Sequence, residues 1–190
     1  MKEVKILKYY RFCFALVLLL LLCIPAESAL KPFLKLCAEG SPSGIWKAVS
    51  TGADVEEKDE AGITALMYSS AYNKNPLSTE ELIKLGADIN AKSNDGRTPL
   101  MWAAALNPTV DVIAVLLRAG SDVNARMDNG FTALTWAVSQ NPNQKIIIKL
   151  LDAGANPNLG RLGKKALDFA KNRADLKGTE ALRRLEAASK

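Results

Sequence analysis

Apolar and polar residues alternate in blocks along residues 99–125, and the blocks predict two helices followed by a turn. The first block is rich in apolar and small residues. Thr98 can cap this helix because its hydroxyl accepts a backbone N–H, and Pro99 suits the first helical position, where a missing N–H costs nothing. Asn107 and Pro108 interrupt the pattern. We expect Asn107 to end the helix in the left-handed conformation that Asn tolerates.

The second block predicts a helix that is largely buried, since its apolar residues cover most of one face. These residues are Val110, Ile113, Val115, Leu116 and Leu117. Gly120 has the usual place of a glycine after a helix C-terminus. Residues 121–129 are polar and lead into Asn129-Gly130, which is a strong signal for a tight turn.

The same pattern recurs along the chain at a constant interval. Three glycines are each followed by Thr two positions later and by Leu four positions later: Gly62-Ile-Thr-Ala-Leu66, Gly96-Arg-Thr-Pro-Leu100 and Gly130-Phe-Thr-Ala-Leu134. A weaker copy, Gly163-Lys-Lys-Ala-Leu167, follows one position short of a full interval. Two further series keep the same interval: Gly52, Gly86, Gly120 and Gly154, and also Asn73, Asn107 and Asn141. A period of about 34 residues predicts a solenoid of stacked repeats.

The repeat resembles the ankyrin repeat, most closely in Arg97-Thr-Pro-Leu-Met-Trp-Ala-Ala104 and in residues 116–125. The resemblance covers residues 31–188. It implies an all-α solenoid of about five helix-turn-helix units, which β-turn or hairpin fingers join. The sequence departs from the family in two respects. The internal copies are 34 residues long rather than about 33, with the extra residue between the two helices, beside Asn107-Pro108 and Asn141-Pro142. The His that normally helps to tie adjacent turns together is replaced by Met67, Met101, Thr135 and Asp168.

The N-terminus has the order of a secretory signal peptide: a basic start, the unbroken apolar run from Phe12 to Ile24, and small residues after it. We therefore expect residues 1–28 to form a signal peptide helix. Residues 29–190 would then be the repeat domain, with units of about 31–57, 58–91, 92–125, 126–159 and 160–190. Two alternatives remain open: a membrane anchor through residues 12–24, and a lipid on Cys23.

Charge gives little support for a nucleic-acid partner. The whole chain has 25 basic and 20 acidic residues, but the expected signal peptide holds four of the basic and two of the acidic ones. The repeat domain is left with a net charge of +3. Residues 161–190 are basic, with a net charge of +5, whereas the finger at residues 54–60 has a net charge of −4. This asymmetry either serves solubility or orients a charged partner.

The composition also argues against an enzyme. His is absent, so this chain cannot form a Ser-His-Asp or Cys-His site. The recurring aromatic residues are expected to form a core between repeats rather than a ligand platform. They are Tyr68, Trp102, Trp136 and Phe169. Cys37, the only Cys of the repeat domain, is expected to be a small buried group. We expect no catalytic site, no cofactor and no metal.

The resemblance to ankyrin repeats implies that a partner protein binds the concave face, which turn tips and first helices form. The family's contact positions correspond here to Glu60, Ile63, Tyr72, Asn94, Asp95, Arg97, Leu106, Asp128, Asn129, Phe131 and Gln140. Apolar groups are typical interface anchors if they are exposed. Ile63, Tyr72, Leu106 and Phe131 are therefore anchor candidates, and the alternative is that they pack on adjacent fingers.

The sequence thus predicts an exported, monomeric and non-catalytic protein–protein interaction module, located in the periplasm or secreted. It would touch a membrane only through an uncleaved N-terminal segment. The alternatives are an immunity or inhibitor protein that occludes a toxin or an enzyme, and a secreted effector directed at a host.

Overall fold

The computed structural model describes residues 30–161 and 164–190, and the predicted signal segment lies outside these residues. Contacts divide the chain into Met1–Lys31 and Pro32–Lys190, and only the second unit is described below. It contains five successive helix pairs within the described residues: α2 (Pro32–Glu39) and α3 (Pro42–Ser50), α4 (Ala65–Tyr72) and α5 (Pro76–Lys84), α6 (Pro99–Leu106) and α7 (Val110–Arg118), α8 (Ala133–Gln140) and α9 (Gln144–Asp152), and α10 (Ala166–Ala170) and α11 (Glu180–Ala188). A 3₁₀ turn, η1 (Ala174–Leu176), joins the last two helices. This arrangement confirms the all-α solenoid.

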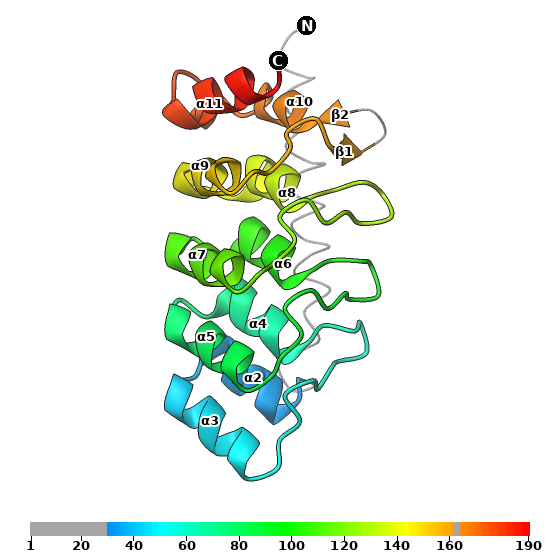
Figure 1. Ribbon diagram of the computed structural model, residues 1–190, viewed down its shortest axis with the longest axis vertical. Coiled ribbons are helices and arrows are strands. Elements are labelled where there is room, and N and C mark those ends of the chain that lie inside the picture. The colour runs from blue at the N-terminus through cyan, green and yellow to red at the C-terminus, as the bar shows by residue number, and fades with distance from the viewer. Residues whose placement is uncertain (1–29, 162–163) are drawn as a thin grey trace, which may run out of the picture. The chain divides into compact units, whose positions relative to one another are not determined.

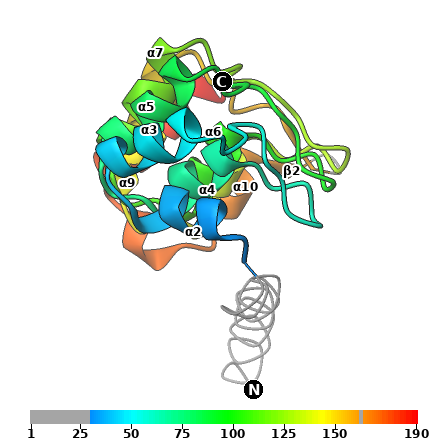
Figure 2. The ribbon, with the colours of Figure 1, turned by 90° about the horizontal axis from the view of Figure 1, so that it is seen from below.

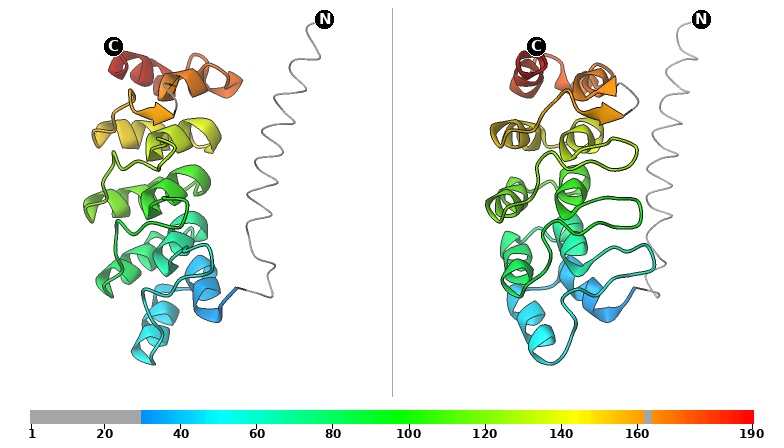
Figure 3. Two further views of the ribbon diagram at one scale, coloured as in Figure 1. Left: turned by 90° about the vertical axis from the view of Figure 1, so that its right-hand side faces the viewer. Right: turned by 45° about the vertical axis from the view of Figure 1, so that its right-hand side comes forward.

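The helix pairs stack so that two layers form (Figure 1). The first helices of the pairs contact one another in the order α2, α4, α6, α8 and α10, and we call them the inner helices. The second helices form the outer layer in the order α3, α5, α7, α9 and α11. Fingers connect each outer helix to the next inner helix and project together to one side (Figure 2; Figure 3). In the last finger, β1 (Gly160–Arg161) pairs antiparallel with β2 (Lys164–Lys165), with Gly160 opposite Lys165.

The two layers differ in burial because inner helices are covered on both sides. In α6, every residue from Pro99 to Ala105 is buried, whereas α7 buries only Val112, Ile113, Val115 and Leu116. Ala103 and Ala104 are fully buried, and their small side chains allow the neighbouring inner helices to approach closely. None of the described helices has both the length and the apolarity that crossing a bilayer requires.

Threonine caps begin the internal inner helices, as predicted. The hydroxyls of Thr64, Thr98 and Thr132 accept hydrogen bonds from the backbone N–H groups three residues later, at 3.2, 3.4 and 3.3 Å. Of the residues that replace the family's His, Met67, Thr135 and Asp168 also take part in capping. Met67 Sδ and Thr135 Oγ1 accept from the backbone N–H of the capping residue, at 3.5 and 2.7 Å. Such reciprocal bonds satisfy backbone donors that the first helical turn leaves without partners.

The asparagines that end the inner helices are not left-handed, so this prediction was wrong. Asn107 has φ −82° and ψ 124°, and Asn73 and Asn141 are extended in the same way. The side chains, rather than an unusual backbone, explain why Asn recurs there. By contrast, Gly120 has φ 95°, as its place after an outer helix predicted.

Candidate functional site

An interleaved column of side chains holds the fingers against the inner helices. The Arg97 guanidinium, from the finger before α6, lies between two indole rings, 4.6 Å from the Trp102 centroid and 4.5 Å from the Trp136 centroid. The Phe131 ring, from the next finger, lies 5.0 Å from the Trp136 ring and 5.4 Å from the Phe169 ring. Each finger therefore contacts its own inner helix and the next one. Cation–π and ring–ring contacts of this kind favour a fixed geometry.

Two of the four anchor candidates are buried in this part of the molecule, which agrees with the alternative that they pack within the stack rather than anchor a partner. Phe131 is 9% exposed and Ile63 is 8% exposed. The reason is that the finger folds over the aromatic row of the inner helices, so a side chain at this position points into the repeat contact. Arg97 takes the same position in the middle finger, and its side chain is 15% exposed. The predicted core role of Tyr68, Trp102 and Trp136 is confirmed, because all three are buried.

The other candidates form a row along the ends of the inner helices. Tyr72 is 39% exposed, and Leu106 and Gln140 are half-buried at the equivalent positions of α6 and α8. The Tyr72 ring lies 6.2 Å from the Tyr68 ring. Burial raises the pKa of Tyr72, and the positive charge of Arg97 partly opposes this effect. The hydroxyl therefore stays protonated at neutral pH and can both donate and accept a hydrogen bond.

The remaining candidates lie on the finger tips, where Glu60, Asn94, Asp95, Asp128 and Asn129 are all exposed. Several are fixed by local bonds. Asn94 Nδ2 donates to the Glu60 carbonyl at 3.0 Å, and this bond ties adjacent fingers together. Asp95 forms an ion pair with Arg97 at 2.9 Å, and Asn129 Oδ1 accepts from the Phe131 N–H at 3.0 Å. The tips are thus held in place before any partner arrives, which lowers the entropy cost of binding.

An asparagine ladder, formed by Asn73, Asn107 and Asn141, joins the inner helices of neighbouring repeats. Asn107 Nδ2 donates to the carbonyls of Ser70 and Asn73, at 3.0 and 2.9 Å, and its Oδ1 accepts from the Thr109 N–H at 2.9 Å. Asn141 makes the equivalent donor bonds to Ala104 and Asn107, at 3.0 and 2.9 Å. The regular spacing of these asparagines was visible in the sequence, but their ladder was not predicted.

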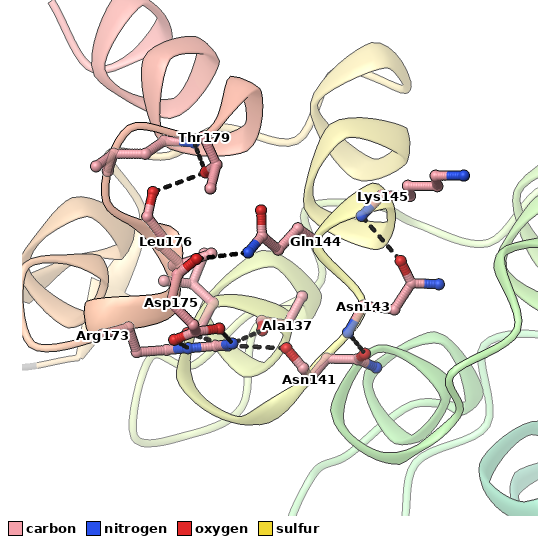
Figure 4. Close-up of polar contacts among 11 residues, drawn as sticks. Ala137, Asn141, Asn143, Gln144, Lys145, Arg173, Asp175, Leu176 and Thr179 are labelled. Atoms are coloured by element: carbon pink, nitrogen blue, oxygen red, sulfur yellow. Dashed lines mark hydrogen bonds and ion pairs between the residues drawn. The ribbon is translucent and has the colours of Figure 1, made fainter.

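Arg173 ends the ladder at the C-terminal pair, and sequence reasoning missed it. Its guanidinium donates to the carbonyls of Val138 and Asn141, at 3.0 and 2.8 Å, where a further asparagine would bind (Figure 4). Asp175 accepts from the other side of the same guanidinium. This interaction lowers the pKa of the Asp175 carboxyl. Arg173 falls short of a full repeat period after Asn141, so the period does not mark it.

Much of the basic charge near the C-terminus is paired. Lys171 pairs with Asp168, Arg183 with Glu180, and Arg184 with Asp152. Exposed pairs contribute little to stability, but they reduce the field that a free basic patch would have. Asp168 and Glu180 are already counted in the net charge of +5 for residues 161–190, so among these partners only Asp152 lies outside that range and offsets it further.

The part of the chain that the structure describes contains no candidate metal site, and its free cysteine is buried. Residues 30–161 and 164–190 contain no group of three or more His, Cys, Asp or Glu side chains that could hold a metal ion. Cys37 is fully buried, and burial followed by the negative charge of Glu57 raises its pKa to about 12. Its thiolate is therefore disfavoured at neutral pH. Burial and a hydrogen bond to Asp59 raise the pKa of Tyr68 far above its usual range.

Stacked helix pairs with fingers on one side define a helical-repeat protein. A family model described as "Ankyrin repeats (3 copies)" matches residues 33–127 and 70–161. The chain therefore belongs to the ankyrin repeat family. A search of curated proteins finds no relative that matches it. Ankyrin repeats are generally protein–protein interaction modules and are typically non-catalytic.

Proposed function

We propose that this chain is an exported, non-catalytic module that binds one partner protein on its finger face. We define the finger face by Tyr72, Leu106 and Gln140 at the ends of the inner helices and by the exposed tips Glu60, Asn94, Asp95, Asp128 and Asn129. The main support for this proposal is the partly exposed row of Tyr72, Leu106 and Gln140. This row lies beside fingers that are fixed by their own contacts. Arg97 packs against the Trp102 and Trp136 rings and so holds its finger in place beside this face. Ile63 and Phe131 are buried and are no longer proposed as contacts.

The composition of the finger face favours a polar partner with one apolar anchor. Tyr72 is the large apolar group with the greatest exposure on this face, and aromatic residues of this type are frequent hot spots. The tips around it carry the carboxylates of Glu60, Asp95 and Asp128, so the complementary surface would be basic.

Export is proposed from the sequence of residues 1–28, and it places the protein in the periplasm or outside the cell. Immunity or inhibitor function remains a second candidate, and a host-directed effector a third. An inhibitor would bind one enzyme or toxin at a fixed stoichiometry, whereas a general scaffold would bind several partners weakly.

Site-specific photo-crosslinking tests the binding surface. A photoreactive amino acid replaces Tyr72 or Leu106 on the finger face, and Leu77 serves as the matched control, because it is 57% exposed on the outer helix α5. In envelope extract, we expect one stoichiometric crosslinked band from the two finger-face positions and none from Leu77. Crosslinks that form only from Leu77 would contradict the proposal.

Mass spectrometry of the N-terminus tests export separately. We expect the mature chain to begin near Ala29. A chain that still begins at Met1 in the membrane fraction would replace cleavage with anchoring, and it would leave the binding surface untouched.

A further inference from the structure

The fingers form one row, because they project together to the same side of the stack (Figure 3). Their formal charges change along this finger row. The first finger, residues 54–64, contains five acidic residues and one basic residue, and the second, residues 88–98, contains two of each. The third finger, residues 122–132, contains two acids and one base, whereas the last, residues 156–165, contains three bases and no acid. The finger row is therefore acidic at one end and basic at the other.

The first finger keeps its negative charge in the folded protein. Asp54 and Glu60 are exposed. Asp54 Oδ1 accepts from the Glu56 N–H at 2.9 Å, and Glu56 Oε1 accepts from a backbone N–H of the next finger at 2.7 Å. These donors are neutral, so the bonds fix the carboxylates without cancelling their charge. Glu57 and Lys58 have interactions of their own and opposite charges, and we count neither of them.

The last finger is the basic counterpart. Its strands, Gly160–Arg161 and Lys164–Lys165, hold all three of its basic residues. Lys165 is exposed and lies opposite Gly160 in the pairing of the two strands. The next acid along the chain is Asp168, which already forms an ion pair with Lys171 at 3.3 Å. We call the first finger the acidic end of the row and these two strands its basic end.

Contacts between neighbouring fingers hold the row in one shape. Asn94 ties the second finger to the first, since its Nδ2 donates to the Glu60 carbonyl at 3.0 Å and its backbone N–H to the Ala61 carbonyl at 2.9 Å. Gly130 of the third finger lies so close to the Gly160 carbonyl oxygen that a Cβ would not fit there. The two ends are therefore kept three repeats apart, which is about 25–30 Å.

We infer that two copies of this chain associate finger to finger in an antiparallel arrangement. A twofold axis would cross the row between the second and third fingers, so each acidic end would meet the basic end of the other copy. Both end contacts are then attractive, whereas a parallel arrangement would place like charges together. A nucleic acid is uniformly negative and would be repelled by the acidic end, but a second copy matches both ends. This dimer replaces the monomer that the sequence predicts.

The size of the finger row indicates a weak dimer that depends on charge. The row is about 35 Å long and each two-stranded finger is about 10 Å wide, so it presents on the order of 350 Å². A stable protein–protein interface buries about 800 Å² on each partner. Area alone is therefore insufficient, and attraction between the ends must supply much of the affinity. Salt should weaken the dimer, because it screens charges at exposed sites.

The inference does not rest on the proposed function. Tyr72, Leu106 and Gln140 lie at the ends of the inner helices and have no part in it, so a monomeric chain could still bind a partner there. The dimer shares only the finger tips with the finger face. Binding of the partner and dimerisation would therefore compete for those tips.

Analytical ultracentrifugation of the full chain over a range of protein concentrations tests the association. We expect the dissociation constant of the dimer to rise about tenfold or more between about 20 mM and about 300 mM salt, because the Debye length falls from about 20 Å to about 6 Å. Every variant below keeps the apolar run Phe12–Ile24, so association through that run would be the same in all of them.

Charge exchange between the ends is the decisive test. The acidic variant combines Lys164→Glu with Lys165→Glu and makes the basic end negative. The basic variant combines Asp54→Asn, Glu60→Lys and Ala61→Lys; it removes the charge of the acidic end and keeps the acceptor of the Glu56 N–H. We expect each variant alone to weaken association by about tenfold or more, and a mixture of the two to recover part of the loss, since one attractive end contact is restored.

A matched control places the same charge change elsewhere. Lys145→Glu combined with Lys149→Glu, on the outer helix α9, gives the same net charge as the acidic variant but leaves the fingers unchanged. This control should associate as the wild type does.

Zero-length crosslinking tests the antiparallel arrangement. A carbodiimide couples a carboxylate to an amine that it touches, so we expect a product that joins Glu60 to Lys165. Within one chain these residues belong to the first and the last finger and lie too far apart to touch. The product can therefore form only between two copies, and about 300 mM salt should reduce its yield.

Four results would overturn the inference. A wild type that remains monomeric at low salt and high protein concentration would show that the fingers do not bind one another. Association of either variant alone at the strength of the wild type would show that another surface is responsible. An equal loss in the α9 control would show that net charge, rather than the fingers, controls association. A dimer without the Glu60–Lys165 product would have a different arrangement.

Discussion

The two ends of the helical stack are finished in different ways. At the C-terminal end, Arg173 takes the place of the ladder asparagine and donates to carbonyls of the fourth pair, and α11 places paired charges on the surface. At the N-terminal end, the Gly40 carbonyl accepts from Asn73 Nδ2, at 2.8 Å, and Trp46 stands exposed. A solenoid needs polar terminal units for solubility. The comparison therefore shows that the last pair is joined to the stack by an arginine and carries paired charges, whereas the described residues of the first pair leave a large apolar side chain exposed.

The largest expected effect concerns the aromatic contact between the fourth helix pair and the C-terminal pair. Phe131→Ala should lower the free energy of unfolding by about 3–5 kcal/mol, because the ring is buried between Trp136 and Phe169 and its removal leaves a cavity. Urea denaturation measures this loss. Tyr72→Ala, at a partly exposed position, is the control and should cost clearly less. A loss below about 1 kcal/mol for Phe131→Ala would show that the ring is not part of the core.

A rung in the middle of the ladder should matter nearly as much. Asn107→Ala removes two donor bonds and one acceptor bond from a site that is fully buried. We expect a loss of about 2–4 kcal/mol, because the carbonyls of Ser70 and Asn73 are left without a donor. The same denaturation measurement applies. Replacement by Asp keeps the acceptor but loses the donors, so it should not restore stability.

The terminal rung should cost less than the middle one. Arg173→Ala should lower stability by about 1–2 kcal/mol, because its bonds to the Val138 and Asn141 carbonyls are only part-buried, whereas those of Asn107 are buried, so water can replace it more easily. Hydrogen exchange should become faster in α10 and α11 and remain unchanged in α2. Arg173→Lys retains a donor and should recover part of the loss. If Arg173→Ala and Asn107→Ala lower the free energy of unfolding equally, Arg173 is as important to the stack as an internal asparagine of the ladder.

Alkaline pH should weaken the N-terminal end through Cys37. Its pKa is about 12 in the folded protein and about 9 when the group is unperturbed, so only the unfolded chain loses the thiol proton between these values. Stability is thus complete below pH 9 and falls as pH rises, by about 1.4 kcal/mol per unit. Denaturation at pH 8, 9 and 10 measures the slope. Tyr68 and Tyr72 add to it in the same direction, so the difference between the wild type and Cys37→Ala isolates the thiol.

The smallest effect is expected at Trp46 in the first helix pair. Trp46→Gln should change the free energy of unfolding by no more than about 0.5 kcal/mol, because the ring is mostly in solvent. A loss as large as that of Phe131→Ala would mean that Trp46 is packed.

Features that depend on local sequence were predictable. The threonine caps, the glycines after the outer helices and the aromatic row follow from rules that act within a few residues or within one period. The roles of Asn107, Ile63 and Phe131 could not be predicted in this way. Asn107 donates to carbonyls one full repeat or more away in the sequence, so a rule for helix ends assigned it the wrong task. Ile63 and Phe131 are buried only because the fingers fold over the helices, and this direction is not encoded in the repeat period.

The ladder has a consequence for how such a protein can change in length. Asn107 and Asn141 reach back by the same two sequence intervals to carbonyls of the same kind. Excision of residues 107–140, one repeat length that includes Asn107, would place Asn141 opposite the carbonyls of Ser70 and Asn73, with donors and acceptors still matched. Duplication or loss of a whole unit is thus structurally tolerable in the middle of this chain. An insertion or deletion of a few residues, by contrast, would shift each asparagine amide away from the carbonyls that it binds.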